Sequence, residues 1–170
     1  MLMELSKHMV DLITNSFEAM AKHILVSLSF FGDWVTLEVS DDGTGVSKES
    51  VEAAMRGEKA PRGRGLALLR DAAEQSGGDI SVWSEEGHGT GVRAVFGKDV
   101  PLGKVGDALI VFWQEMPITV ITLSAVTEKG AFVFDSRLIG ERYGDPSDIH
   151  TMVKVRKDVN YTLTNLFGGK

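Results

Sequence analysis

Apolar and polar residues along the chain repeat with two periods, one helical and one alternating. Residues 2–22 carry apolar side chains at helical spacing, which predicts a helix that turns one stripe toward a core. Residues 24–31 and 34–40 alternate on either side of Gly32-Asp33, which predicts a β-hairpin. The opposite face of the first helix carries a polar stripe at spacings of three and four residues: Glu4, His8, Asp11, Asn15, Glu18 and Lys22.

The middle of the chain predicts two further helices and two further strands. The helices are expected at residues 47–55, with Ser47 as N-cap, and at residues 66–75, which end before Gly77-Gly78. Residues 56–64 between them are polar and contain glycine and proline, so a loop is expected there. Strands are expected at residues 80–84 and 92–96, joined by a glycine-rich segment.

The region after Lys98 predicts a separate set of elements. A helix is expected at residues 107–113, a hairpin from residues 118–126 and 131–134, and a last helix that begins at Pro146 and ends near Asn165. We expect residues 1–98 to form a core and residues 99–170 to form an extension of hairpin and helices. The extension would extend or cover the sheet of the core, so that the whole chain is one domain.

Glycine is concentrated in three loops of the predicted core. The chain has 19 glycines in 170 residues, against an average usage of about 7 per cent. Glycine lets the backbone approach a ligand closely, and free N–H groups at the start of a helix attract anions. Taken singly each loop could be an ordinary tight turn, and the chain lacks the GxxxxGK[ST] phosphate loop. The glycines in question are Gly43 and Gly45; Gly63 and Gly65; and Gly87, Gly89 and Gly91.

The order of these loops along the chain resembles the GHKL superfamily of ATP-binding domains, which includes gyrase-type topoisomerases, Hsp90 chaperones and sensor histidine kinases. The resemblance implies a Bergerat-type α/β (α+β) two-layer sandwich, with a mixed, mostly antiparallel sheet and helices on one face. The motifs that carry it are Asp11-Leu-Ile-Thr-Asn15-Ser-Phe-Glu-Ala19, Asp41-Asp-Gly43-Thr-Gly45, Gly63-Arg64-Gly65-Leu66 and Gly87-His-Gly89-Thr90.

The same resemblance implies a Mg-ATP site. Asn15 would bind the Mg²⁺ that bridges the phosphates, Asp41 would accept a hydrogen bond from the adenine amino group, and Thr90 would lie near the adenine. Residues 56–64 would form the lid over the nucleotide. The remaining cofactor-binding positions implied are Gly43, Gly45, Gly63, Arg64, Gly65, Leu66 and Gly89, with Lys22, Arg62, Arg64 and Lys98 as candidate cations for the phosphates.

Asp11 is the predicted catalytic residue. In the ATP-hydrolysing branches of the superfamily a glutamate at this position activates the attacking water, whereas sensor kinases usually carry asparagine there. A carboxylate can act as a general base, so Asp11 favours hydrolysis. His8 lies one turn earlier, where it could orient Asp11 or lie on the helix surface.

Three functions follow from this resemblance. The first is a slow ATPase or ATP-gated switch that acts on a partner protein. The second is a protein kinase module, either an anti-sigma-type serine kinase or a detached histidine kinase module, whose substrate is another protein. The third is a regulatory module that binds nucleotide without hydrolysis. Residues 1–97 with the downstream hairpin also resemble a group of stand-alone bacterial ATP-binding proteins associated by name with iron-only hydrogenases, which implies a hydrogenase-related partner.

Composition limits the kinds of metal site, partner and cellular location that the chain can have. The chain has no cysteine, which excludes disulfides and thiolate metal sites, and its net charge of −6 argues against a nucleic-acid partner. The N-terminus lacks the apolar region of a signal peptide. The longest apolar stretch, residues 108–126, is interrupted by Gln114, Glu115 and Pro117, so no membrane span is expected. We therefore expect a cytoplasmic protein; its oligomeric state is left open.

Overall fold

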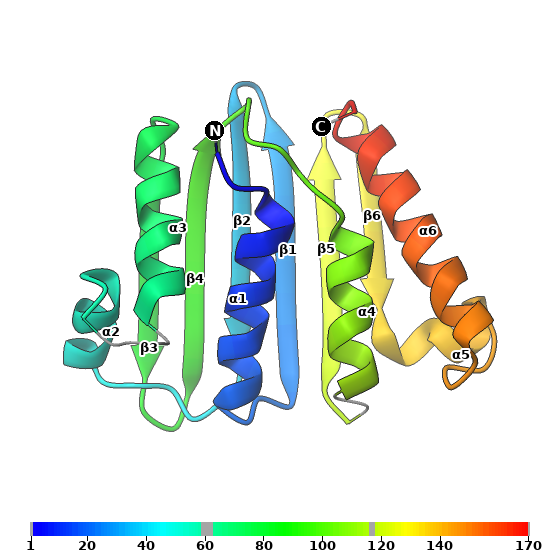
Figure 1. The fold of residues 1–170 in the computed structure, drawn as a ribbon, viewed down its shortest axis with the longest axis horizontal. Coiled ribbons are helices and arrows are strands. Elements are labelled where there is room, and N and C mark those ends of the chain that lie inside the picture. The colour runs from blue at the N-terminus through cyan, green and yellow to red at the C-terminus, as the bar shows by residue number, and fades with distance from the viewer. Residues whose placement is uncertain (1, 59–62, 116–117, 170) are drawn as a thin grey trace.

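One mixed sheet forms the centre of the computed structural model, which describes residues 2–58, 63–115 and 118–169 (Figure 1). The six strands lie in the order β3-β4-β2-β1-β5-β6. Neighbouring strands are antiparallel except β1 and β5, which are parallel. The strands are β1 His23–Phe31, β2 Trp34–Asp41, β3 Asp79–Glu85, β4 Gly89–Gly97, β5 Val120–Thr127 and β6 Gly130–Asp135.

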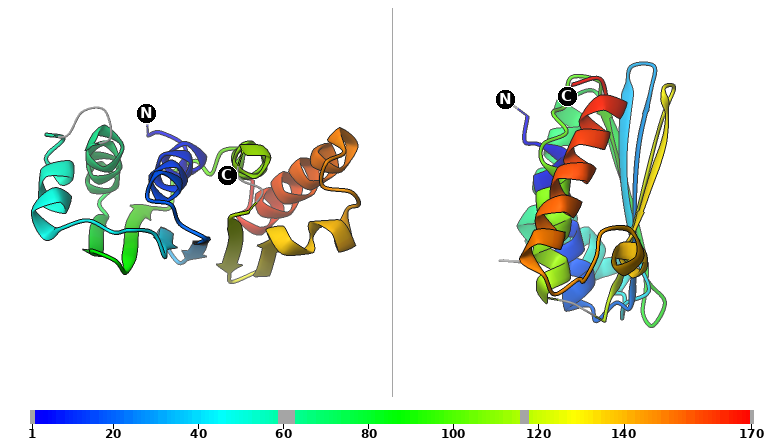
Figure 2. Two further views of the ribbon diagram at one scale, coloured as in Figure 1. Left: turned by 90° about the horizontal axis from the view of Figure 1, so that it is seen from below. Right: turned by 90° about the vertical axis from the view of Figure 1, so that its right-hand side faces the viewer.

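The main helices cover one face of this sheet and leave the other face open (Figure 2). The two-layer α+β fold with a mostly antiparallel sheet is thereby confirmed. Within the described residues, no helix combines the length and apolarity that crossing a bilayer requires. The helices are α1 Leu5–Glu18, α2 Lys48–Met55, α3 Gly63–Gln75, α4 Val105–Glu115, the 3₁₀ turn η1 Ser136–Leu138, α5 Ile139–Arg142 and α6 Ile149–Leu166.

Strand alternation produces the two unlike faces. Along β2 the side chains of Val35, Leu37 and Val39 are buried under the helices, while the positions between them face the open side. This is the pattern expected of an antiparallel sheet with one solvated face. Aromatic side chains on the open face, such as Trp34 and Trp83, are about half exposed.

The extension continues the sheet instead of covering it. β5 pairs with β1 in parallel, from His23 opposite Val120 to Phe30 opposite Thr127, and β6 pairs with β5. α4 packs between α1 and α6. The buried residues of α6, including Val155 and Val159, belong to the same hydrophobic cluster as Phe96 of β4. One core therefore runs beneath all six strands.

The structure corrects the predicted end of the first helix. α1 ends at Glu18, four residues before Lys22. The N–H of Met20 donates to the carbonyl of Phe17 and that of Ala21 to the carbonyl of Ser16, which is the paired bonding of a Schellman turn. Met20 adopts a left-handed φ of 59° there. The polar stripe of the helix therefore stops before Lys22.

Other predicted helix boundaries were also wrong, beginning with the start of α1, which is Leu5 and not residue 2. α3 begins at Gly63, not at Leu66, so part of the predicted loop is helical. α4 begins at Val105. α6 begins at Ile149, because the side chains of Asp145 and Asp148 accept backbone N–H groups in successive turns and cap the helix after Pro146. The turns η1 and α5 were not predicted, and Arg62 lies outside the described residues.

Candidate functional site

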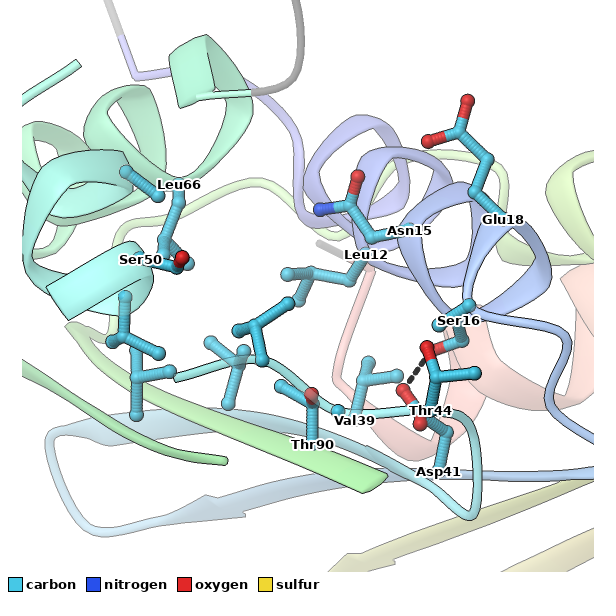
Figure 3. A pocket seen from close by; sticks show the side chains of 17 residues that line it. Leu12, Asn15, Ser16, Glu18, Val39, Asp41, Thr44, Ser50, Leu66 and Thr90 are labelled. Atoms are coloured by element: carbon cyan, nitrogen blue, oxygen red, sulfur yellow. Dashed lines mark hydrogen bonds between the residues drawn. The ribbon is translucent and has the colours of Figure 1, made fainter. Parts of the chain in front are cut away.

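A pocket of about 410 Å³ lies between α1, α2 and the sheet (Figure 3). Its volume is in the range of small-molecule sites. Apolar side chains from strands and helices line most of it, and polar side chains gather beside α1 and the end of β2. The lining residues are Leu12, Asn15, Ser16, Glu18, Ala19, Val39, Asp41, Thr44, Gly45, Val46, Ser50, Val51, Ala54, Leu66, Val82, Thr90 and Val92.

The carboxylate of Asp41 is fixed at the end of β2 by two hydrogen bonds. Ser16 Oγ, on the buried side of α1, donates to Asp41 Oδ2 at 2.6 Å. The backbone N–H of Gly43 donates to Asp41 Oδ1 at 2.9 Å. A carboxylate has about four acceptor positions, so Asp41 can accept a further donor from a ligand in the pocket. Ser16 was not predicted as a site residue; its place directly after Asn15 was the available signal.

The neighbouring carboxylate, Asp42, faces a different part of the molecule. Its Oδ1 accepts the backbone N–H groups of Lys22 and His23 at 2.8 and 2.9 Å. These hydrogen bonds, with His23 the largest contributor, lower the pKa of Asp42 to about 2. Asp42 therefore fastens the α1–β1 connection, and only Asp41 of the two enters the pocket. Lys22 contributes its backbone N–H to this contact, and it is exposed and does not line the pocket.

Thr90 lies in the pocket next to a second serine that was not predicted. The hydroxyl groups of Thr90 and Ser84 are 2.7 Å apart. Ser84 Oγ also donates to the carbonyl of Gly89 at 3.1 Å and accepts the N–H of Val46 at 2.9 Å. Ser84 thus joins β3, β4 and the segment after β2 around Thr90.

The glycines of this region let backbone segments meet each other. A Cβ on Gly89 would lie 2.0 Å from the carbonyl oxygen of Asp41, and a Cβ on Gly45 would lie 2.0 Å from that of Glu85. Both have positive φ, at 97° and 63°. A Cβ on Gly43 would lie 2.7 Å from the carbonyl oxygen of Ala19. Of these three, Gly45 also lines the pocket. Their main effect is to place Asp41 where α1, β2 and β4 converge.

Asp11 lies one turn before Asn15 and packs against α3. A Cβ on Gly65 would lie 3.2 Å from the Asp11 Cβ and 3.4 Å from its Oδ2, so the first turn of α3 lies close against Asp11. Burial raises the pKa of Asp11 above its ordinary value. Asp11 is not among the residues that line the pocket, whereas Asn15 and Leu66 on either side of it are. Arg64 is exposed on the first turn of α3.

His8 and Lys98 lie away from the pocket. His8 is 1 per cent exposed and stacks on Phe96, with ring centroids 6.0 Å apart. Neither of its ring nitrogens has a hydrogen-bond partner among the described residues, and burial lowers its pKa. The surface position considered for His8 was therefore wrong, and no hydrogen bond joins it to Asp11. Lys98 Nζ bonds Asp33 at 2.8 Å, beside the β1–β2 turn.

Asn15 is the residue that could hold a metal ion in this pocket. Its side-chain amide is exposed and faces into the cavity (Figure 3). Among the residues that the structure describes, no three His, Cys, Asp or Glu side chains form a metal-binding group. A single amide oxygen still fits Mg²⁺, because this ion keeps several waters and binds through one or two protein oxygens together with substrate phosphates.

A family model and two relatives each match about half of this chain. Residues 3–99, more than half of the chain, match the family model described as histidine kinase-, DNA gyrase B- and HSP90-like ATPase. The sensor protein CitS of Bacillus subtilis (strain 168) is 36% identical over 102 residues, which cover 55% of this chain and 18% of CitS. The sensor histidine kinase DcuS of Escherichia coli (strain K12) is 34% identical over 85 residues, or 45% of this chain and 16% of DcuS.

This chain spans less than a fifth of the length of either sensor protein. A solved structure of the N-terminal domain of a DNA repair protein superposes with a TM-score of 0.55 and 15% identity, covering 88% of this chain and 58% of that one. At this identity the likeness concerns the fold alone. It includes most of the extension, which the family model does not reach.

Proposed function

The chain belongs to the family of histidine kinase-, DNA gyrase B- and HSP90-like ATPases, and on that premise we propose that it is a slow Mg-ATPase or ATP-gated switch that acts on a partner protein. The observation that carries the proposal is the Asp41 carboxylate, held by Ser16 and Gly43 at the polar end of an otherwise apolar pocket.

Asp41 would select the base. A fixed carboxylate accepts a hydrogen bond from the exocyclic amino group of adenine, whereas guanine presents a carbonyl oxygen at the equivalent position and would be repelled. The apolar side chains of Val39, Val82 and Val92 supply a surface for the ring. The phosphates would then extend toward Asn15 and the first turn of α3. Mg²⁺, when bound there, would neutralise negative charge on the phosphate oxygens.

Asp11 would act as the general base for hydrolysis. The attacking water would lose its proton to the Asp11 carboxylate as its oxygen bonds to the γ-phosphorus, and ADP would leave with the electron pair of the broken P–O bond. Burial raises the pKa of Asp11, which makes its carboxylate a stronger base than an exposed one. Because Asp11 lies one turn before Asn15 and does not itself line the pocket, we expect it to reach the γ-phosphate through the water itself.

A protein kinase is the second candidate, because two relatives of this chain are sensor proteins and one of them is named a histidine kinase. In that case the γ-phosphoryl group passes to a side chain of a protein substrate instead of water. The third candidate, binding without turnover, would use the pocket and leave Asp11 idle.

Binding and turnover of γ-labelled ATP separate these functions. We expect Asp41→Asn to weaken ATP binding by about 10- to 100-fold, the effect of losing a hydrogen bond to a charged group. Asp11→Asn should bind ATP normally and slow phosphate release by about 100-fold or more. The control is Asp33→Asn, at the exposed β1–β2 turn.

Each of the other outcomes assigns a different function. Release at the same slow rate from the wild type and Asp11→Asn would remove Asp11 as the base. Label that accumulates on an added protein in place of free phosphate would favour the kinase. Binding without release or transfer, with the partner present, would favour the regulatory module. Equal affinity for ATP and GTP would contradict the role of Asp41.

A further inference from the structure

α2 forms one wall of the pocket, although little of it is buried. Ser50, Val51 and Ala54 of this helix line the cavity. No residue of α2 is fully buried, unlike in α1 and α6. The helix has eight residues, too few to be stable without tertiary contacts. Its position therefore depends on contacts with α3, β3 and the core, to which Ala54 and Met55 contribute.

The C-terminal end of α2 is held by a residue of α3. Arg70 Nη1 donates to the carbonyl oxygen of Met55, the last residue of α2, at 2.5 Å. The last carbonyls of a helix are unpaired within it and carry partial negative charge, so a guanidinium is a favourable partner. Two hydrogen bonds to the carboxylate of Asp71, at 3.1 and 2.7 Å, align the Arg70 guanidinium.

The N-terminal end of α2 is held by its own cap and by a hydrogen bond to β3. Ser47 Oγ accepts the N–H of Ser50 at 3.3 Å, and the N–H of Val46, directly before this cap, donates to Ser84 Oγ at 2.9 Å. Past the C-terminal end the chain turns at Gly57, with a φ of 72°, and runs against Ala67 of α3. Arg70 thus supplies a side-chain hydrogen bond that ties α2 to α3.

We propose that Arg70 is a positioning residue, a latch that holds α2 against α3 and so fixes the width of the pocket. Arg70 does not line the pocket, and it would act through Met55 and the α2 side chains that do. The role in ligand retention rests on the proposed function. The mechanical role, fixing α2, does not depend on the identity of the ligand.

The test uses Arg70→Met, which keeps the length and packing of the arginine stem and removes all its donors. We expect the backbone amides of α2 to exchange hydrogen for deuterium faster, while those of α3 beyond its first turn keep their protection. We also expect ATP to dissociate about tenfold faster. Arg70→Lys, whose ammonium can still donate to the Met55 carbonyl, should restore most of both properties.

The matched control is Arg56→Met at the same end of α2. Arg56 is exposed and bonds Glu58, two residues along, without bridging to α3. Unchanged exchange of α2 in Arg70→Met would overturn the latch, as would equal effects of the two variants or equal loss of protection throughout α3. If the wild-type protein binds no ATP, the proposed function fails, while the exchange of α2 still decides whether Arg70 holds the helix.

Discussion

The two hairpins at the edges of the sheet share one architecture and differ in what their backbones touch. β3 with β4 and β5 with β6 are antiparallel pairs built from alternating residues. In the first hairpin the N–H of Gly87 donates to the carbonyl of Thr44 at 2.7 Å, and Gly89 lies directly against Asp41. In the second, a Cβ on Gly130 would meet nothing nearer than Leu166 Cδ1, at 3.8 Å.

This difference explains why the pocket lies at the β3–β4 hairpin and not at the β5–β6 hairpin. Alternation is enough to make a strand pair, and both hairpins have it. The pocket forms only where a third segment approaches one of the pairs closely enough to place Asp41, Ser16 and Thr90 together. At this close approach the chain has glycines, such as Gly45 and Gly89, because a Cβ there would clash with the neighbouring backbone.

The largest loss of stability is expected from an alanine substitution at a glycine that combines a positive φ with a close backbone contact. Gly89→Ala would place a Cβ 2.0 Å from the carbonyl of Asp41, and we expect it to cost at least about 3 kcal/mol and to abolish ATP binding. Gly130→Ala is the control, because its φ is also positive, at 146°, with open space around it. Backbone strain alone should cost it about 1–2 kcal/mol. Urea unfolding measures both, and equal costs would contradict the distinction between the hairpins.

A core truncation in the extension tests whether the two halves of the sheet unfold together. Leu163 of α6 is 1 per cent exposed, so Leu163→Ala should cost about 2–5 kcal/mol. Because one hydrophobic cluster joins α6 to β4, we expect a single unfolding transition by circular dichroism and by tryptophan fluorescence. Tyr161→Ala, at an exposed position of α6, should change the stability by no more than about 0.5 kcal/mol. Two separate transitions would show that the extension is a domain of its own.

Sequence patterns predicted the strands well because alternation depends on residues next to each other. They failed at Lys22, because α1 ends in a turn whose left-handed residue is methionine, which gives no terminating signal. The residues of the candidate site also fall into those that sequence motifs predicted and those that they did not. Asn15, Asp41, Leu66 and Thr90 line one pocket as the motifs suggested, whereas Ser16, Ser84 and Arg70 act through partners six or more residues away. Such partners become visible only once the chain is folded.

Acid should lower the free energy of unfolding through His8. Burial lowers the pKa of this histidine in the folded protein, so below pH 6.5 the unfolded chain binds more protons than the folded one. Stability therefore falls as the pH drops below about 6.5, by up to about 1.4 kcal/mol per pH unit, until the lowered pKa is passed. His8→Leu should remove this part of the pH dependence in urea unfolding between about pH 5 and 7.

The control for His8 lies in the extension. His150 is exposed near the start of α6, so His150→Leu should leave the pH dependence as it is in the wild type. An equal pH slope in the wild type and His8→Leu would show that the buried imidazole is not the group that titrates.

The smallest change in stability is expected at the C-terminal ends of two helices, α1 in the core and α6 in the extension. α1 and α6 end in the same paired turn: Met20 and Ala21 donate back to Phe17 and Ser16, and Gly168 and Gly169 donate back to Asn165 and Thr164. The left-handed position is glycine in α6, with a φ of 76°, and methionine in α1, with a φ of 59°.

The side chain of Met20 is 78 per cent exposed, so little packing offsets the strain of about 1–2 kcal/mol. Met20→Gly should therefore raise the free energy of unfolding by about 1 kcal/mol and the Tm by about 2–4 °C. Gly168→Met should lower both by a similar amount, and Met3→Gly, an exposed methionine ahead of α1, should bring no gain. A loss of stability in Met20→Gly would mean that this side chain contributes more to the folded state than its exposure indicates, and the two helix ends would then not be equivalent.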